Sequence, residues 1–359
     1  MPFDRYLDHA ALSLRLRALA AEHPRLLELE ALGASREGRP IWLVTLAARR
    51  EVRPPADRPA LWVDGNIHAG ELVGSMAALH FIEALVRDYG HDPAVTRCLD
   101  TRAVYVCPRV APDGADAALA ARPRLLRSGP RPYPHADPLP GGTIPEDLDG
   151  DGRILLMRVP DALGAWKVSA EHPRLMTARD PAESGGRYYR LLTEGLLADG
   201  ADTGPAGRPA PGLDFNRNFP AGWQVEGTQP GAGPHPLSEP ETQALAQFVA
   251  AHRNIGAGVA LHSYGGVLLR PSSTRADEAL PPADLALYER LGQEATRRLG
   301  LPCASAYHAF RERGSPGISG AFDDWLYEHF GALGFTLELW SPQRAAGIAV
   351  DDHLGWGRD

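Results

Sequence analysis

The sequence predicts an α/β fold, in which helices cover a β-sheet. Segments rich in β-branched and aliphatic residues alternate with segments of helical periodicity, which is typical of a sheet with helical crossover connections. The chain has 359 residues, of which 44% are apolar and 23% charged, so it is long enough to bury one large core. No linker or internal repeat divides it, and we therefore expect a single domain over residues 1–359.

The expected elements follow one another in chain order. A helix over residues 9–21 comes first, because its leucines recur at helical spacing before Pro24 ends the pattern. Ser238 and Glu241 have the spacing of a capping box, which begins a helix that runs to residue 252. The remaining predictions are strands at 41–46, 60–64, 104–107, 213–216, 257–261 and 334–339, and helices at 71–89, 283–299 and 324–330.

The regular pattern stops between about residues 122 and 211, where Pro, Gly, Asp and Arg dominate. This stretch is too long for an ordinary loop, so we expect a folded insertion over the sheet. Within it, Asp147, Asp149 and Asp151 have the spacing of a calcium-binding loop, although Arg158 stands where such a loop requires a bidentate glutamate. Bound calcium and simple Asp-Gly turns both fit these residues.

The composition argues against several functional classes. The 37 basic residues are outnumbered by 45 acidic ones, and the formal net charge of -8 argues against nucleic-acid binding and against a basic membrane anchor. No apolar stretch is long enough to cross a bilayer. Three cysteines without Cys-x-x-Cys spacing predict reduced thiols, and an N-terminus without a signal-peptide pattern predicts a cytoplasmic protein.

His68 and Glu71 form the sharpest chemical motif of the chain. They lie where a predicted strand passes into a helix, and their i, i+3 spacing allows both side chains to face one point. His262 directly follows another predicted strand, and two histidines with one glutamate are a ligand set of catalytic zinc sites. Taken alone, the His-x-x-Glu pair is better explained by an ordinary helix start with a hydrogen-bonded histidine, and the other residues of the chain reverse that preference.

Further polar residues support a catalytic site. Asn216 and Arg217 place an amide beside a guanidinium, a pair suited to binding a carboxylate. Glu338 is a single carboxylate in an otherwise apolar strand, where burial would raise its pKa towards that of a general base.

These motifs, in this order, resemble those of the M14 zinc carboxypeptidases, which are the carboxypeptidase A/B-like metallopeptidases. The resemblance extends from residues 33–41 to the strand of Glu338, with an enlarged middle. It implies a three-layer α/β/α fold around a mixed, mostly parallel sheet of about eight strands. It also implies roles for individual residues: zinc bound by His68, Glu71 and His262, Asp214 orienting a ligand histidine, Asn216 and Arg217 holding the terminal carboxylate of a peptide, and Glu338 as general base.

The resemblance leaves three assignments open. An arginine should stabilise the oxyanion, and Arg127 is the best match, with Arg158 as its competitor because the insertion obscures the alignment. Asp323 matches the base of the side-chain pocket, where an acidic residue implies preference for C-terminal Lys or Arg, but it also fits a simple helix cap. The tyrosine that digestive members close over the substrate falls at Pro316, with Tyr307 as a substitute.

The function implied is zinc-dependent hydrolysis of the C-terminal bond of peptides that carry a free carboxylate. A cell-wall peptide hydrolase or an acyl-amino-acid deacylase would use the same site on a different substrate. A binding module without activity is disfavoured, because all three ligand residues and Glu338 are present. The sequence carries no signal of the oligomeric state.

Overall fold

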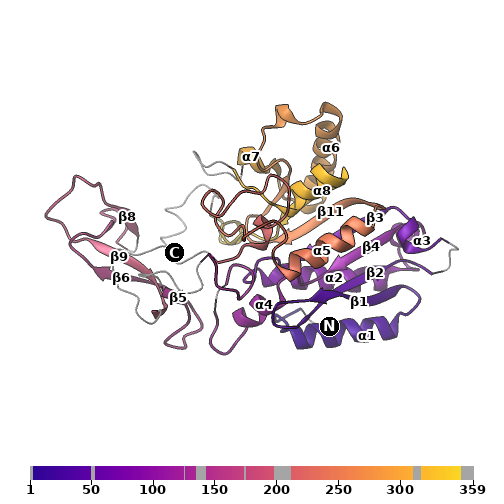
Figure 1. Ribbon diagram of the computed structural model, residues 1–359, viewed down its shortest axis with the longest axis horizontal. Helices are drawn as coiled ribbons and strands as arrows, with labels where there is room; N and C mark the ends of the chain where they lie inside the picture. The colour runs from indigo at the N-terminus through magenta and orange to yellow at the C-terminus, as the bar shows by residue number, and fades with distance from the viewer. Residues whose placement is uncertain are drawn as a thin grey trace.

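The computed structural model describes residues 3–49, 53–124, 126–134, 143–173, 175–197, 212–309 and 317–348. Its centre is an eight-stranded sheet of order β1-β2-β4-β3-β11-β14-β12-β13 (Figure 1). The strands are β1 (Leu27–Ala34), β2 (Pro40–Leu46), β3 (Ala60–Gly65), β4 (Ala103–Cys107), β11 (Ile255–His262), β12 (Val267–Arg270), β13 (Cys303–Ser305) and β14 (Leu333–Glu338). Four of the seven pairings are parallel, namely β4 with β3, β3 with β11, β11 with β14, and β12 with β13. The mixed, mostly parallel sheet is confirmed.

Helices cover both faces of this sheet. On one face, α1 (His9–Glu22), α2 (Leu72–Asp88) and α3 (Pro93–Thr101) contribute to a core with Val63 and Val104. On the other, α5 (Pro240–Ala251) and α8 (Phe322–Phe330) pack on Trp62 and Tyr105. Because neighbouring residues of a strand point to opposite faces, β3 supplies both cores. Three layers result, as expected.

The other elements are short or lie at the edges. A long helix, α6 (Pro282–Leu299), packs over the last strands of the sheet through the buried Tyr288 and ends at Gly300 in the left-handed conformation. The remaining helical segments are η1 (Pro55–Asp57), α4 (Pro112–Ala118), η2 (Phe215–Arg217), η3 (Asp277–Ala279), α7 (Ala306–Ala309) and α9 (Pro342–Ala345). In the part of the chain that is described, no helix combines the length and apolar character needed to cross a membrane.

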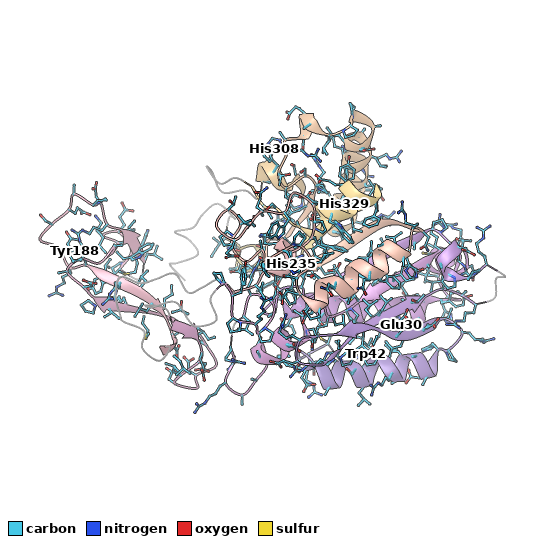
Figure 2. All side chains as sticks on the ribbon, viewed as in Figure 1. Glu30, Trp42, Tyr188, His235, His308 and His329 are labelled. Atoms are coloured by element: carbon cyan, nitrogen blue, oxygen red, sulfur yellow. The ribbon has the colours of Figure 1, made fainter. Side chains whose placement is uncertain are left out.

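The insertion forms a lobe beside the sheet rather than over it, so that expectation is wrong (Figure 1). Its strands are β5 (Thr143–Pro145), β6 (Leu156–Pro160), β7 (Trp166–Val168), β8 (Met176–Ala178), β9 (Tyr189–Thr193) and β10 (Gly195–Leu197), in one sheet of four strands and one of two. Figure 2 shows Tyr188 on this lobe, where the guanidinium of Arg179 lies 4.0 Å from the centre of its ring. Large apolar side chains such as Leu156 and Leu163 stay exposed, because none of the helices in the described segments covers these small sheets.

Two local predictions are wrong. The N-cap of α5 is Glu239, without a side-chain capping bond, because Ser238 instead accepts a hydrogen bond from Asn218 Nδ2 and Glu241 accepts one from Arg36 N. The expected strand at 213–216 is replaced by η2, since the Asp214 side chain accepts from Asn216 N and turns the chain. All three cysteines lie in described segments and are unpaired, as expected.

Candidate active site

The candidate residues meet at the carboxyl ends of three adjacent parallel strands. His68 follows β3, His262 ends β11 and Glu338 ends β14. The strand register places His262 directly opposite Glu338, and Leu261 opposite Gly65. Ligand sites of open α/β sheets form at such an edge.

Glycines allow this junction to pack backbone against backbone. A Cβ atom at Gly65 would lie 2.6 Å from the Gly74 carbonyl oxygen, and one at Gly74 would lie 2.6 Å from that of Leu261. The turn between β3 and α2 is held by Asn66, whose Nδ2 donates to the carbonyls of His68 at 2.7 Å and Ala69 at 3.1 Å. Because no side chains separate the backbones of β3, α2 and β11 at these glycines, His68 lies close to β11.

Three potential ligand atoms converge at this point. His68 Nδ1 lies 2.7 Å from Glu71 Oε1, while His262 Nδ1 lies 3.1 Å from both His68 Nδ1 and Glu71 Oε2. Zinc bound tetrahedrally with bonds of about 2.0–2.1 Å would hold its ligand atoms roughly 3.3 Å apart, so the observed spacing fits. Two imidazoles and a carboxylate are also the donor types that zinc prefers in hydrolases. Burial by itself would raise the pKa of Glu71, but hydrogen bonds with His262 and His68 outweigh it and hold that pKa well below its ordinary value.

Asp214 links these groups to an arginine. Its Oδ1 lies 3.1 Å from His68 Nε2, and its Oδ2 accepts from Arg127 Nε at 2.9 Å. Arg127 Nη1 in turn lies 3.6 Å from Glu71 Oε1. Burial opposes ionisation of Asp214, yet Arg217, Arg127 and His68 together hold its pKa well below the usual range. An ionised Asp214 fixes the orientation of His68.

Asn216 and Arg217 lie side by side on η2. The Oδ1 atom of Asn216 accepts from Phe322 N at 2.9 Å, so its Nδ2 group is the end left to donate to a ligand. Arg217 Nη1 donates to the Asn216 carbonyl at 2.7 Å, and its Nη2 lies 3.8 Å from Asp214 Oδ2. The pair is thus pre-oriented beside the cluster of His68, Glu71 and His262.

Comparison with known proteins agrees with this geometry. The family model for zinc carboxypeptidases, peptidase M14, matches residues 14–349. The chain belongs to this family. Carboxypeptidase A1 of Rattus norvegicus is 25% identical over 333 residues, covering 89% of this chain and 59% of the relative, and that of Sus scrofa is 25% identical over 332 residues with the same coverage. The chain therefore spans about 59% of the length of these relatives.

Two solved structures share the fold. Thrombin activatable fibrinolysis inhibitor superposes with a TM-score of 0.60 at 20% identity, covering 93% of this chain and 66% of that one. Carboxypeptidase A from Helicoverpa armigera gives a TM-score of 0.60 at 19% identity, covering 95% of this chain and 66% of that one. These likenesses confirm the fold expected for an M14 chain.

Arg127 and Arg158, the two candidates for oxyanion stabilisation in this M14 chain, lie in different parts of the structure. Arg127 lies at the ligand cluster, whereas Arg158 lies on β6 of the lobe, with its guanidinium 5.6 Å from the ring centre of Tyr189. Of these two arginines, Arg127 is the one that lies near Glu71 and Asp214. Pro316 lies outside the described residues, and Tyr307 lies on α7 against His308.

Asp323 does not cap α8. The N-cap is Ala321, and no side chain caps this helix. Asp323 is instead buried, with Oδ1 accepting from Asp324 N and Oδ2 from Thr336 Oγ1, both at 3.0 Å. The capping alternative is wrong.

The calcium-like loop is stabilised by its own turns. Asp147 accepts from the backbone N–H groups of Gly150 and Gly152, and Asp149 accepts from that of Asp151. These are the hydrogen bonds of Asp-Gly turns. Bound calcium is not supported.

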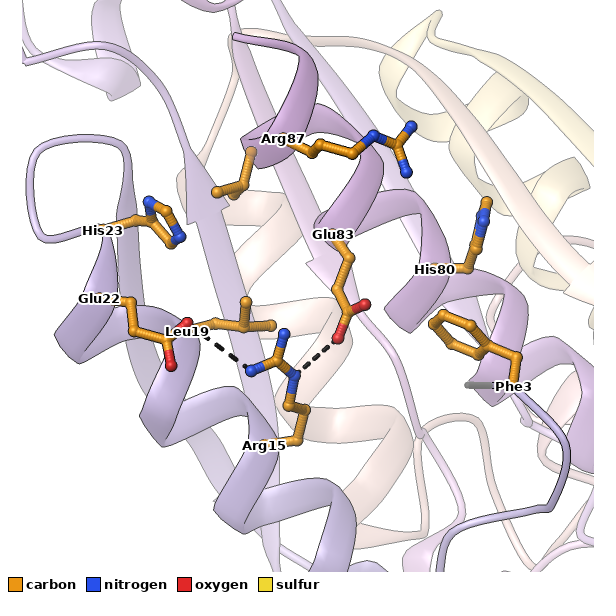
Figure 3. Close-up of a pocket in the computed structure, with 9 residues that line it drawn as sticks. Phe3, Arg15, Leu19, Glu22, His23, His80, Glu83 and Arg87 are labelled. Atoms are coloured by element: carbon orange, nitrogen blue, oxygen red, sulfur yellow. Dashed lines mark hydrogen bonds and ion pairs between the residues drawn. The ribbon is translucent and has the colours of Figure 1, made fainter. Parts of the chain in front are cut away.

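Two features of this M14 chain were not predicted from its sequence. Asp64, at the end of β3, is 1% exposed, and burial raises its pKa to about 7. A separate pocket of about 350 Å³ lies where α1 approaches α2, and Arg15 spans it with ion pairs to Glu22 and Glu83 (Figure 3). None of the candidate site residues lines that pocket.

Proposed function

We propose that this chain is a zinc-dependent metallocarboxypeptidase that hydrolyses the C-terminal peptide bond of peptides. The observation that carries the proposal is the convergence of His68, Glu71 and His262, whose side chains make pairwise contacts of 2.7–3.1 Å between potential ligand atoms. Glu338 stands opposite His262 in the strand register, and Arg127 reaches the same cluster. Family membership supports zinc as the metal.

The terminal carboxylate of the peptide would be bound by Asn216 and Arg217. Asn216 offers its Nδ2 group, and Arg217 offers the N–H groups that its contact with the Asn216 carbonyl does not use. Because both donors lie beside the cluster, a bound carboxylate would set the bond nearest the C-terminus against it. This arrangement favours removal of single residues over internal cleavage.

The proton transfers would fall to Glu338. A zinc ion held by the three ligands supplies Lewis acidity, which polarises the scissile carbonyl and makes water a better nucleophile near neutral pH. Glu338 is buried, burial raises its pKa, and a base of raised pKa both accepts the proton of the attacking water and returns it to the leaving amine. Arg127 would donate to the oxygen on which negative charge develops.

Asp323 would favour C-terminal Lys or Arg. It is 4% exposed and lies at the start of α8 on the side of the sheet that carries Asp64. A buried carboxylate rejects apolar side chains and pairs with a cationic one.

The test is mass spectrometry of peptides that differ only in the C-terminal residue, each as a free acid and as an amide. The zinc-loaded protein is expected to remove single C-terminal residues from the free acids only, and the His68→Ala variant to remove none. A bias towards Lys and Arg that Asp323→Ala abolishes would support the specificity assignment. Internal cleavage, or equal hydrolysis of the amides, would refute the exopeptidase and favour a cell-wall peptide or an acyl-amino acid as substrate.

A further inference from the structure

Asp64 is a buried carboxylate that the proposed reaction does not use. It lies on β3, and its Oδ2 accepts from Trp62 Nε1 at 2.8 Å. Its Oδ1 is buried and, within the described segments, has no hydrogen-bond partner. A buried carboxylate oxygen without a hydrogen bond is destabilising, so this atom calls for a donor.

His262 has a matching unsatisfied atom. Its Nδ1 faces His68 and Glu71, while Nε2, on the far side of the ring, is buried and also lacks a partner among the described residues. A neutral imidazole that offers the Nδ1 lone pair to a metal must carry its proton on Nε2. That proton needs an acceptor.

The sheet register brings these two atoms towards each other. β3 and β11 run parallel with Asp64 opposite Ala260, so Asp64 and His262 are diagonal neighbours whose side chains point to the same face. Diagonal neighbours have Cβ atoms about 7–8 Å apart, and an imidazole ring spans much of that separation. Burial raises the pKa of Asp64, and electrostatic attraction to His262 opposes that shift, as expected of neighbouring groups.

The other ligand histidine already shows the arrangement. His68 directs Nδ1 to the cluster and Nε2 to Asp214 Oδ1 at 3.1 Å. A carboxylate behind a ligand histidine fixes its tautomer and ring orientation, and removing it typically weakens metal binding by 10–100-fold.

We propose that Asp64 is a positioning residue whose Oδ1 accepts the Nε2 proton of His262, directly or through one water, and so aims Nδ1 at the metal. Asp64 then does for His262 what Asp214 does for His68. This inference rests on the zinc site proposed above but not on peptide hydrolysis.

The test is zinc affinity, measured by chelator competition on Asp64→Asn in the full chain. The amide keeps the shape and the contact with Trp62 but turns an N–H group towards His262. We expect the dissociation constant to rise about 10–100-fold, with a comparable rise for Asp214→Asn. Asp324→Asn is the matched control, because Asp324 is a carboxylate of similar burial that accepts from Ser273 N instead. The absorption spectrum of the cobalt-substituted protein should change in the Asp64 and Asp214 variants alone.

Unchanged zinc affinity in Asp64→Asn, or an equal loss in Asp324→Asn, would overturn the inference. If Asp64→Asn does not fold, ¹⁵N-histidine NMR of the wild-type zinc form decides: a slowly exchanging Nε2 proton on His262 is expected, and an Nδ1 tautomer would refute the inference. A wild type that binds zinc without hydrolysing any peptide would refute the proposed function and leave this inference standing. A wild type that binds no divalent metal would refute both.

Discussion

Gly74→Ala is expected to lower the zinc affinity of the protein, although Gly74 is not one of the proposed metal ligands. Gly74 is the third residue of α2, and the added Cβ would lie 2.6 Å from the Leu261 carbonyl oxygen and 3.2 Å from Asn66 N. Leu261 precedes the proposed ligand His262, and Asn66 donates hydrogen bonds within the turn that carries His68. The substitution therefore presses apart the two segments that carry the histidines.

The contact sets the size of the effect. A relaxed C–O contact lies at about 3.3 Å, so α2 and β11 must separate by roughly 0.7 Å. Overpacking costs about 3 kcal/mol at the upper end of its range. We use this upper value because both atoms that the new Cβ would meet, Leu261 O and Asn66 N, belong to the backbone and cannot rotate away. Alanine regains about 1 kcal/mol through its higher helix propensity, which leaves a net loss of about 2 kcal/mol. Binding sites tolerate displacements of about 0.5 Å, so we expect at least a tenfold loss of zinc affinity.

Urea unfolding of the metal-free protein and chelator competition measure the two effects separately. Gly256→Ala is the matched control: it lies on β11, and an added Cβ there meets no atom within 4 Å. It should leave zinc affinity unchanged and the unfolding free energy the same or slightly higher. A Gly74→Ala variant that is about 1 kcal/mol more stable than wild type and has unchanged zinc affinity would show that helix propensity alone sets its stability. That result would refute the predicted steric clash.

Three further predictions concern single side chains. Arg127→Ala should lower kcat about 10²–10³-fold with little change in KM, as expected for a group that meets charge only in the transition state; a change confined to KM would contradict this. Glu338→Gln should lower kcat about 10²–10⁴-fold in the peptide assay yet bind zinc like wild type, and a fully active variant would exclude Glu338 as the base. Glu241→Gln should stabilise the protein by about 2–3 kcal/mol above pH 7, an effect that disappears towards pH 4.5 in urea titrations. Burial raises the pKa of Glu241 to about 7, so the native state keeps a proton that the unfolded chain loses, and wild-type stability falls as pH rises through this window; a pH-independent difference would contradict the assignment.

The positions of the two candidate ligand histidines and of Glu338 could be predicted because each is tied to a strand end. His68, His262 and Glu338 each follow a run of aliphatic residues long enough to be recognised as a buried strand. In a parallel sheet such ends share one edge, so the local pattern also determines proximity. The sheet itself was predictable for the same reason, since buried strands need continuous apolar runs.

The parts that were mispredicted depend on tertiary contacts. Ser238 and Glu241 have the spacing of a capping box, but bonds with Asn218 and Arg36, both distant in sequence, take their side chains away. The strand β1 escaped prediction although Leu27 and Leu29 alternate with glutamates, because one strand face stays largely exposed and the run is weakly apolar. The insertion could not be placed, since its strands are short and bury little apolar surface to dictate a docking face.

Charge explains why buried acids gather around this edge of the sheet. With neutral histidines, the carboxylates of Glu71, Asp214 and Glu338 outweigh the guanidinium groups of Arg127 and Arg217 by one negative charge, and an ionised Asp64 would make it two. Uncompensated negative charge in a low-dielectric site is destabilising, and a divalent cation at the ligand cluster cancels it. The same carboxylates that orient the histidines and activate water would therefore also raise the affinity of the site for a doubly charged metal. Metal binding, in turn, would stabilise the strands whose ends it joins. The free-energy cost of burying an ionised Asp64 would therefore be offset only when a metal is bound at the ligand cluster that His262 faces.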